Sequence, residues 1–269
     1  MTHAPATARA LLASALSVTA LLTAVACSAG GRETARSVPA PYTPAPAPSS
    51  SPAAPAADQP TSAPPPALGE EQVRAALITE VDLGEPWVPT RGAATWRDGM
   101  LKADTENADC RRLLDALYTE ELYGAPTGPR AVVTLDDSYN DSQLRYQIAT
   151  HPPADVDRVL TWLGTLPKTC ERFTATTSRA GAQDVEVEEL SLPEVGDARQ
   201  ALRVTMAGET ADGEPTYLTV DLATVRVGEN AVVLTNGGFG EVLSEITRAV
   251  THLGADRLAE IGRQARVRV

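Results

Sequence analysis

The sequence is poor in basic residues, in aromatic residues and in cysteine. It holds 23 Lys and Arg against 35 Asp and Glu, which gives a formal net charge of -12. Phosphate backbones and anionic headgroups repel a chain of that charge. We therefore expect no nucleic-acid binding, and membrane attachment has to come from lipid rather than from a basic patch. Because aromatic residues make up only 4% of the chain, Val, Leu, Ile and Ala must fill its core.

The motifs that accompany nucleotide and metal binding are also missing. The run Asn236–Gly240 has glycines but neither the Lys-Ser/Thr pair of a phosphate loop nor the third glycine of the dinucleotide pattern, so we interpret it as a structural turn. The run Asp136–Asp141 resembles a calcium loop, but Asp141 occupies its glycine position and Gln147 its glutamate position. A turn rich in Asp and Asn explains this run, and calcium is the alternative.

No catalytic residue stands out. No serine lies in a Gly-x-Ser-x-Gly motif. Glu186, Glu188 and Glu189 are expected to form a solvated strand face, with an acid–base pair among them as the alternative. Beyond the export signal described next, the only histidines are His151 and His252, so a metal site with several histidine ligands is excluded. The sequence therefore predicts no catalytic residue, no metal and no cofactor.

Residues 1–26 are predicted to be a lipoprotein signal peptide. The run from Ala10 to Ala26 is apolar except for Ser and Thr, too short for a membrane span, and suited to the core of an export signal. It ends in the sequence Ala-Val-Ala-Cys-Ser, which resembles the lipobox in which the cysteine receives diacylglycerol. We expect Cys27 to be lipidated and to anchor the chain on the outer face of the cell membrane. An ordinary secretory signal with a chance cysteine is the alternative.

Residues 27–67 are predicted to be a disordered linker. They consist mostly of Pro, Ala, Ser and Thr, and proline recurs every two to four positions from Pro39 to Pro55. Such a composition cannot bury a core and favours extended polyproline conformations. We expect this segment to be a spacer that holds a single folded domain, residues 68–269, away from the bilayer.

The number of cysteines supports the lipid anchor. Three cysteines in an exported protein leave one unpaired. Lipidation of Cys27 accounts for the odd one and leaves Cys110 and Cys170, which should form a disulfide in an oxidising compartment. A catalytic thiol is the alternative for either of these two, although neither lies in a nucleophile motif.

Hydrophobic periodicity predicts both helices and strands in the folded part. The predicted helices, with apolar residues at helical spacing, span residues 70–80, 107–121, 153–166 and 241–266. The predicted strands, in which apolar and polar residues alternate, span residues 130–135, 144–148, 173–177, 185–188, 202–206, 218–227 and 231–235. Within the predicted strand 218–227, the apolar residues shift from one face to the other after Leu222. This change of phase predicts a bulge or a bend.

The order of these elements predicts the fold class. Strands joined by short turns, with helices at the start, in the middle and at the end, are typical of an α+β domain. We expect a single domain with an antiparallel β-sheet and helices packed on one face. Alternation along the strands implies that the other face is polar and solvent-facing.

Several features together resemble a group of actinobacterial lipoproteins. They are the lipobox, the spacer, the run Leu77–Gly84 (LITEVDLG) followed by Trp87, and a helix with the pattern Cys110-x-x-Leu-Leu. The folded part of that group is similar to the extracellular sensor domain of mycobacterial receptor Ser/Thr kinases. The resemblance covers about residues 70–266 and implies an antiparallel sheet with helices around a cleft for a small ligand. The family supplies no catalytic residues, and it carries two disulfides where this chain has cysteines for one.

The sequence thus predicts a membrane-anchored extracytoplasmic lipoprotein that acts as a non-catalytic binding or sensing module. Its expected partners are the membrane, through the lipid, and a small ligand or envelope component of unknown identity. Two alternatives belong to other functional classes. One is an exported hydrolase whose serine or carboxylate groups converge only in space, and the other is an envelope assembly protein that binds a wall polymer or another protein.

Overall fold

The computed structural model describes residues 67–210 and 212–267. The predicted signal peptide, Cys27 and all but the last residue of the predicted linker lie outside these residues and stay predictions. The chain divides into two units, Met1–Pro60 and Thr61–Val269, and the described fold belongs to the second. In the part that is described, no helix has the length and apolar character needed to cross a membrane.

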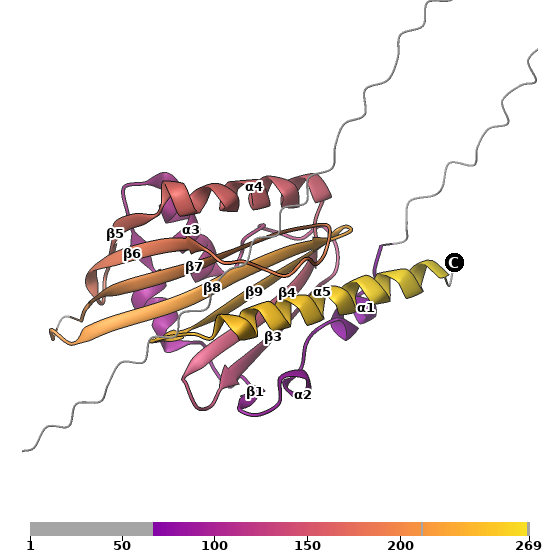
Figure 1. Ribbon diagram of the computed structural model, residues 1–269, viewed down its shortest axis with the longest axis horizontal. Helices are drawn as coiled ribbons and strands as arrows, with labels where there is room; N and C mark the ends of the chain where they lie inside the picture. The colour runs from indigo at the N-terminus through magenta and orange to yellow at the C-terminus, as the bar shows by residue number, and fades with distance from the viewer. Residues whose placement is uncertain (1–66, 211, 268–269) are drawn as a thin grey trace, which may run out of the picture. The chain divides into compact units, whose positions relative to one another are not determined.

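Within the described residues, nine strands form one sheet in which all neighbouring strands run antiparallel (Figure 1). The strands are β1 (Trp87–Pro89), β2 (Ala103–Asp104), β3 (Arg130–Asp137), β4 (Ser142–Thr150), β5 (Arg172–Thr177), β6 (Gly181–Glu189), β7 (Ala198–Glu209), β8 (Pro215–Val227) and β9 (Asn230–Phe239). Their order across the sheet is β1-β3-β4-β9-β8-β7-β6-β5-β2. The long strands β8 and β9 therefore lie in the middle, and the short strands β1 and β2 close the two edges.

The helices are α1 (Glu70–Ala75), α2 (Glu80–Leu83), α3 (Ala108–Thr119), α4 (Pro153–Thr169) and α5 (Ser244–Val267), with a π-helical turn η1 at Arg97–Leu101. The single helix predicted over residues 70–80 thus ends at Ala75, and a second short helix begins at Glu80. The chain breaks between them because Ile78 is fully buried and because the backbone amide of Thr79 donates a hydrogen bond to the carboxylate of Asp82, which starts α2.

Local chemistry explains where the longer helices begin. The side chain of Asn107 accepts hydrogen bonds from the backbone amides of Asp109 and Cys110, and it thereby caps α3. Helix α4 begins with Pro153, whose fixed backbone angle suits the first helical position. Both helices start where the sequence predicts, within one or two residues.

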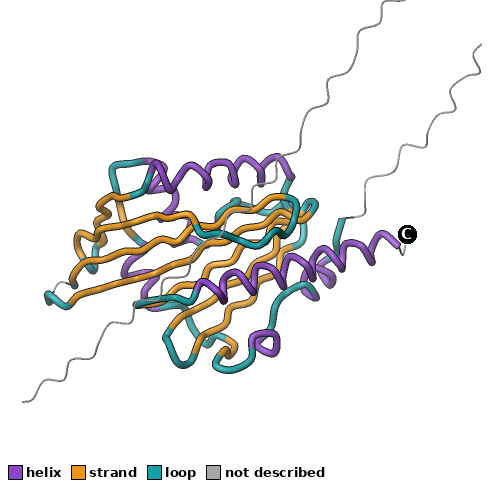
Figure 2. Tube along the Cα trace, in the orientation of Figure 1, coloured by secondary structure: helices purple, strands orange, loops and turns teal. Residues whose placement is uncertain are grey.

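The predicted class, an α+β single domain built on an antiparallel sheet, is confirmed. The prediction that the helices pack on one face and leave the other to solvent is wrong, because the helices are divided between the two faces of that sheet (Figure 2). Helices α3 and α4 share an apolar core with one face of β5–β8. Helices α1 and α5 share a second core with the opposite face of β3, β4, β8 and β9. In Figure 1, α5 lies in front of the strands and α3 lies behind them.

Residues 218–225 of strand β8 are buried on both faces. Its residues Leu218, Val220 and Leu222 belong to the core under α3 and α4, whereas Ala223 and Val225 belong to the core under α5. The pairing of β8 with β7 and with β9 keeps one register along its whole length. The predicted bulge is therefore wrong, because the change of phase marks the point at which the larger apolar side chains switch from one covered face to the other.

The glycine-rich run 236–240 also differs from its prediction, because residues 236–239 belong to strand β9. A Cβ atom at Gly237 would lie 2.9 Å from the ring of Trp96, and one at Gly238 would lie 2.9 Å from the Cβ of Ser142. Ordinary side chains cannot approach so closely. Gly237 and Gly238 therefore serve close packing on a strand, and of the three glycines only Gly240, with φ of 86°, lies in the connection between β9 and α5.

Candidate functional site

The pairing of strands β5–β9 arranges polar side chains in three rows on the face that α5 covers in part. The first row is Thr174, Asp184, Ala207 and Tyr217, the second is Arg172, Glu186, Thr205 and Thr219, and the third is Glu188, Arg203, Asp221 and Asn236. Neighbouring strands lie about 4.8 Å apart, so the first row spans about 14 Å from Thr174 to Tyr217. These residues are distant in the sequence, and only the register brings them together.

The part of these rows on β5–β7 and at the start of β8 is not covered by a helix. We call it the open strip, and define it as Arg172, Thr174, Asp184, Glu186, Thr205, Ala207 and Tyr217. Helix α4 packs against β6 and β7 on the opposite face, and α5 packs over β8 and β9. The strip is consequently open to solvent, and Tyr217 is 46% exposed.

The open strip is hollowed. A cavity of about 480 Å³ is lined by all seven residues of the strip together with Phe173 and Val185. That volume falls within the range of small-molecule sites in proteins. The hollow is shallow, and a regular sheet forms its floor, so its lining side chains are held at fixed spacings.

One ion pair lies across the open strip. The guanidinium of Arg172 donates to the carboxylate of Glu186 at 2.9 Å, and this hydrogen bond raises the pKa of Arg172 above its usual value. Among the side-chain hydrogen bonds and ion pairs of the described residues, this pair alone involves side chains of the strip, so Asp184, Thr205 and Tyr217 have no side-chain partner there. Their hydrogen-bonding capacity is available to a ligand.

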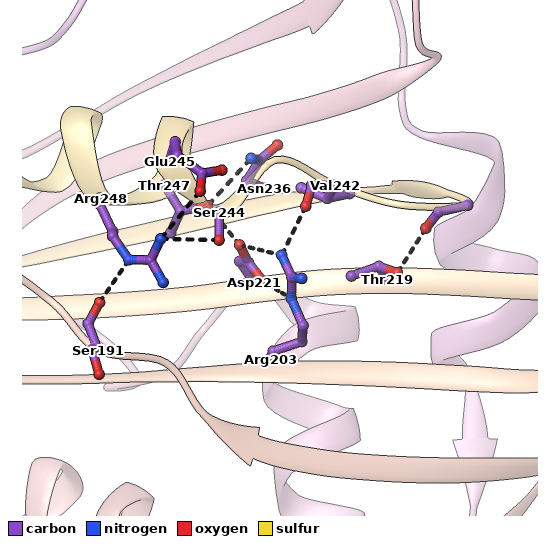
Figure 3. Close-up of polar contacts among 11 residues, drawn as sticks. Ser191, Arg203, Thr219, Asp221, Asn236, Val242, Ser244, Glu245, Thr247 and Arg248 are labelled. Atoms are coloured by element: carbon purple, nitrogen blue, oxygen red, sulfur yellow. Dashed lines mark hydrogen bonds and ion pairs between the residues drawn. The ribbon is translucent and has the colours of Figure 1, made fainter. Parts of the chain in front are cut away.

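The third row enters the protein interior beneath α5 (Figure 3). Asp221 is fully buried and is held from two sides. Arg203 donates two hydrogen bonds to it, from Nε at 2.7 Å and from Nη2 at 3.1 Å, and Thr247 of α5 donates a third at 2.8 Å. Asn236 donates to the hydroxyl of Thr247 at 3.2 Å. A buried charge requires such compensation, and the network fastens α5 to the centre of the sheet.

Arg203 marks the boundary between this network and the open strip. Its side chain is 27% exposed, and its Nη2 also donates to the backbone carbonyl of Val242 in the segment before α5. Hydrogen bonding to Asp221 raises the pKa of Arg203, against the opposing effect of burial. Arg203 therefore stays charged, and it is already committed to the structure rather than free for a ligand.

Two polar atoms beneath α5 lack a hydrogen-bond partner in the described part of the chain, Oδ1 of Asn236 and the hydroxyl of Tyr146. Tyr146 is fully buried, and burial raises the pKa of its phenol. The Tyr146 hydroxyl occupies the space that a side chain at position 254 would need, because a Cβ atom at Gly254 would lie 2.1 Å from this hydroxyl. The glycine thus lets α5 pass directly over the tyrosine.

A second charged cluster lies on the opposite face of the sheet. The carboxylate of Glu120 contacts both Arg97 and Arg145, the latter at 2.8 Å. Burial lowers the pKa of Arg145, although Glu120 opposes that effect. Glu120 ends α3 in the left-handed conformation, with φ of 59°, which costs a non-glycine residue free energy. This cluster joins the end of α3 to β4, and we assign it a structural role.

The structure joins Cys110 and Cys170 in a disulfide, with 5.6 Å between their Cα atoms. It links the first turn of α3 to the residue that ends α4, and both cysteines are buried in the core beneath these helices. The two cysteines lie 60 positions apart in the sequence. The disulfide thus clamps together the two helices that cover one half of the sheet.

The acidic residues considered in the sequence are placed differently from one another. Glu186 and Glu188 share the solvent-facing side of β6, and Glu186 belongs to the open strip. Glu189 points to the opposite face by strand alternation.

The predicted turn at residues 136–141 is the β3–β4 hairpin, where Asp137 accepts hydrogen bonds from the amides of Tyr139 and Asn140. Among the described residues, no three acidic, His or Cys side chains gather as metal ligands.

The two histidines also lie apart. His151 is buried beside the ring of Tyr123, and burial lowers its pKa. His252 is exposed on α5 and contacts Asp256, one helical turn further along the same helix, at 3.0 Å. Neither residue belongs to the open strip or to the network around Asp221.

Sequence reasoning missed that network. A weak signal was present, because Asp221 interrupts an apolar stretch in β8, and Thr247 and Thr251 recur at helical spacing on the buried side of α5. Polar residues at positions expected to be buried indicate an internal hydrogen-bond network. Their partner, Arg203, could be found only once the register of β7 and β8 was known.

Two solved structures are among those that resemble this chain. The extracellular domain of PknH from Mycobacterium tuberculosis is 13% identical, covers 74% of this chain and 100% of its own, and has a TM-score of 0.45. An uncharacterised protein from Mycobacterium smegmatis is 12% identical, covers 67% of this chain and 93% of its own, and has a TM-score of 0.36. No family model and no curated protein matches the sequence. The first of these two structures is an extracellular domain from a mycobacterium.

Proposed function

We propose that this domain is a non-catalytic binding module, held outside the cytoplasmic membrane by lipid on Cys27, and that its ligand contacts the open strip. The observation that carries the proposal is the strip itself. Unpartnered polar groups and a half-exposed tyrosine line a hollow on the part of this sheet face that α5 leaves uncovered. Such groups, fixed on a rigid scaffold, bind a ligand at a low cost in conformational entropy.

The chemistry of the strip favours binding over catalysis. A carboxyl group that acts as a general acid is commonly tuned by burial in an apolar environment. Asp184 is instead exposed, and Glu186 is held by Arg172. The buried carboxylate beside the strip, Asp221, is committed to Arg203 and Thr247. These placements suit recognition groups and a structural network, and they do not resemble a nucleophile with its base.

The predicted lipid anchor provides the location. Cys27→Ala is expected to abolish incorporation of radiolabelled palmitate and partitioning of the protein into the detergent phase. A Cys27→Ala protein that still carries lipid would contradict the anchor. This test is independent of the binding test, because it concerns residues outside the described domain.

Ligand screening tests the binding function. A ligand at a hundredfold excess over its dissociation constant stabilises the folded state by about 2.7 kcal/mol, so a thermal-shift screen of lipids, wall fragments and metabolites should give a specific hit. Esterase, peptidase and glycosidase panels should show no turnover. Replacement of Asp184 or Tyr217 by alanine should weaken the hit, whereas Asp155→Ala on α4 should not. Turnover that disappears with Asp184→Ala would establish a hydrolase instead.

A further inference from the structure

We propose that the hollow of the open strip takes a neutral polyhydroxylated ligand, one saccharide unit of a longer glycan. This inference rests on the proposed binding function and names the chemistry of its ligand. Its first support is the kind of polar group present. Asp184 has two carboxylate oxygens that accept hydrogen bonds, while the hydroxyls of Thr174 and Thr205 both donate and accept. Adjacent hydroxyl groups on a sugar ring match such a set.

The charges of the strip support a neutral ligand. Arg172 and Glu186 neutralise each other across neighbouring strands. Arg203, at the border of the strip, is neutralised by Asp221. Asp184 is then the one carboxylate in the hollow without a cationic partner among the described residues. An anionic ligand would meet no free arginine here, and within the hollow a ligand would meet one unpaired carboxylate, that of Asp184, with Glu188 beyond its edge on the same strand.

The aromatic residue is placed for stacking. Tyr217 stands at the end of the first row, and its neighbour across the strands is Ala207, whose small side chain leaves room beside the ring. The face of an aromatic ring carries partial negative charge and attracts the polarised C–H groups of an apposed ligand. A sugar ring presents such groups on one side and hydroxyls around its edge, so Tyr217 and Asp184 can contact one unit at the same time.

The shape of the hollow fits a polymer better than a small apolar molecule. Pockets for small apolar ligands enclose most of the ligand surface and are lined mainly by apolar side chains. This hollow is open to solvent, six of its nine lining residues are polar, and exposed polar side chains continue beyond it at Thr176 on β5 and Glu188 on β6. A chain of linked units can therefore enter and leave along the strands.

The test uses the exported protein, purified in a detergent whose headgroup contains no sugar. The protein is applied to an array of immobilised neutral and acidic oligosaccharides, and the strongest neutral hit is then titrated by calorimetry. We expect Tyr217→Ala and Asp184→Ala each to weaken binding at least about tenfold, which corresponds to about 1.4 kcal/mol. Two matched controls, Tyr139→Ala at the β3–β4 hairpin and Asp155→Ala on α4, are expected to leave affinity unchanged, because these exposed residues lie outside the hollow.

Salt separates this ligand class from a cationic one. Raising NaCl from about 0.01 M to about 1 M shortens the Debye length from about 30 Å to about 3 Å and weakens charge-driven binding. Glycan binding should change little over this range, whereas binding of tetralysine, used as a cationic probe, should be absent or lost. An array without neutral hits, or a hit unaffected by both Tyr217→Ala and Asp184→Ala, would overturn the inference.

The failures of the two proposals can be told apart. If tetralysine or another non-glycan ligand binds and the same two variants abolish its binding, the binding function holds and the saccharide inference fails. If the protein cleaves the glycan and Asp184→Ala stops the cleavage, the binding function itself is wrong.

Discussion

Replacing Asp221 with alanine should lower the free energy of unfolding by about 3 kcal/mol. Removal of one partner from a buried ion pair costs about 3–5 kcal/mol, because the remaining charge is left uncompensated. We place Asp221 at the lower end of that range because Arg203 is 27% exposed and can turn partly toward water. The hydroxyl of Thr247 also loses its acceptor, which adds to the loss rather than offsetting it.

Urea denaturation followed by circular dichroism measures this change, and thermal unfolding provides a second readout. For a domain of this size, about 3 kcal/mol corresponds to a fall in Tm of about 6–12 °C. The matched control is Glu194→Ala, which breaks an ion pair with Arg199 at a carboxylate that is 96% exposed. Exposed pairs contribute about 0–1 kcal/mol, so this variant should unfold almost like the parent protein.

A double variant separates the burial of charge from simple loss of packing. When Asp221→Leu is combined with Arg203→Met, no charge is left behind, and the double variant should be more stable than Asp221→Ala alone. The reasoning is refuted if Asp221→Ala costs less than about 1 kcal/mol, the level of an exposed pair. It is also refuted if the double variant is less stable than the sum of its single substitutions predicts.

Three further predictions concern the rest of the described domain. Removal of both Cys110 and Cys170 should cost about 4 kcal/mol in urea denaturation, because the disulfide closes a loop of 60 residues in the unfolded chain, and a loss below about 1 kcal/mol would contradict this. Tyr146→Phe should leave stability unchanged or raise it, because the buried hydroxyl has no partner among the described residues, and a clear loss would reveal a hydrogen bond to it. A hydrogen bond from Arg257, against the opposing effect of burial, lowers the pKa of Asp82 to about 2. Its ionised carboxylate therefore stabilises the fold above about pH 4, and this contribution should be lost as the pH falls to about 2. The measurement is the difference in Tm between the parent protein and Asp82→Asn, which should vanish over this pH interval.

Local signals in the sequence are enough to predict many elements of this fold. Asn107 followed by apolar residues at helical spacing marks the start of α3, and Pro153 marks the start of α4. Alternation predicts most of the strands, because side chains in a strand point to opposite faces in turn. The antiparallel class follows from the short connections between these strands.

Which face each helix covers could not be predicted. The change of phase after Leu222 suggests a bulge, whereas β8 is continuous and its residues 218–225 are covered on both sides. The difference arises because a strand buried on both faces loses the simple alternation that a half-buried strand displays. Helix α5, at the end of the described chain, covers the face that alternation alone assigns to solvent.

The candidate site lay beyond sequence reasoning for a related reason. Thr174 and Tyr217 stand at opposite ends of one row, yet 43 positions separate them in the chain. Strand register alone brings them onto one surface, and a shift of one residue would turn either side chain to the other face. Of the strip residues, only Glu186 is singled out by the sequence as a candidate. Its partner in the strip is Arg172, and alternation along one strand cannot identify a partner on the neighbouring strand.

Covalent footprinting on cells tests the central claim, that the open strip is the surface on which the ligand lies, and it does so even while the ligand is unidentified. Tyrosine labelling is compared between the protein on intact cells and the purified exported protein. Tyr217 should be protected on cells and labelled after purification, whereas Tyr139, which is 75% exposed and lies outside the strip, should be labelled in both. Equal labelling of Tyr217 in the two states, with Tyr139 unchanged, would contradict the account.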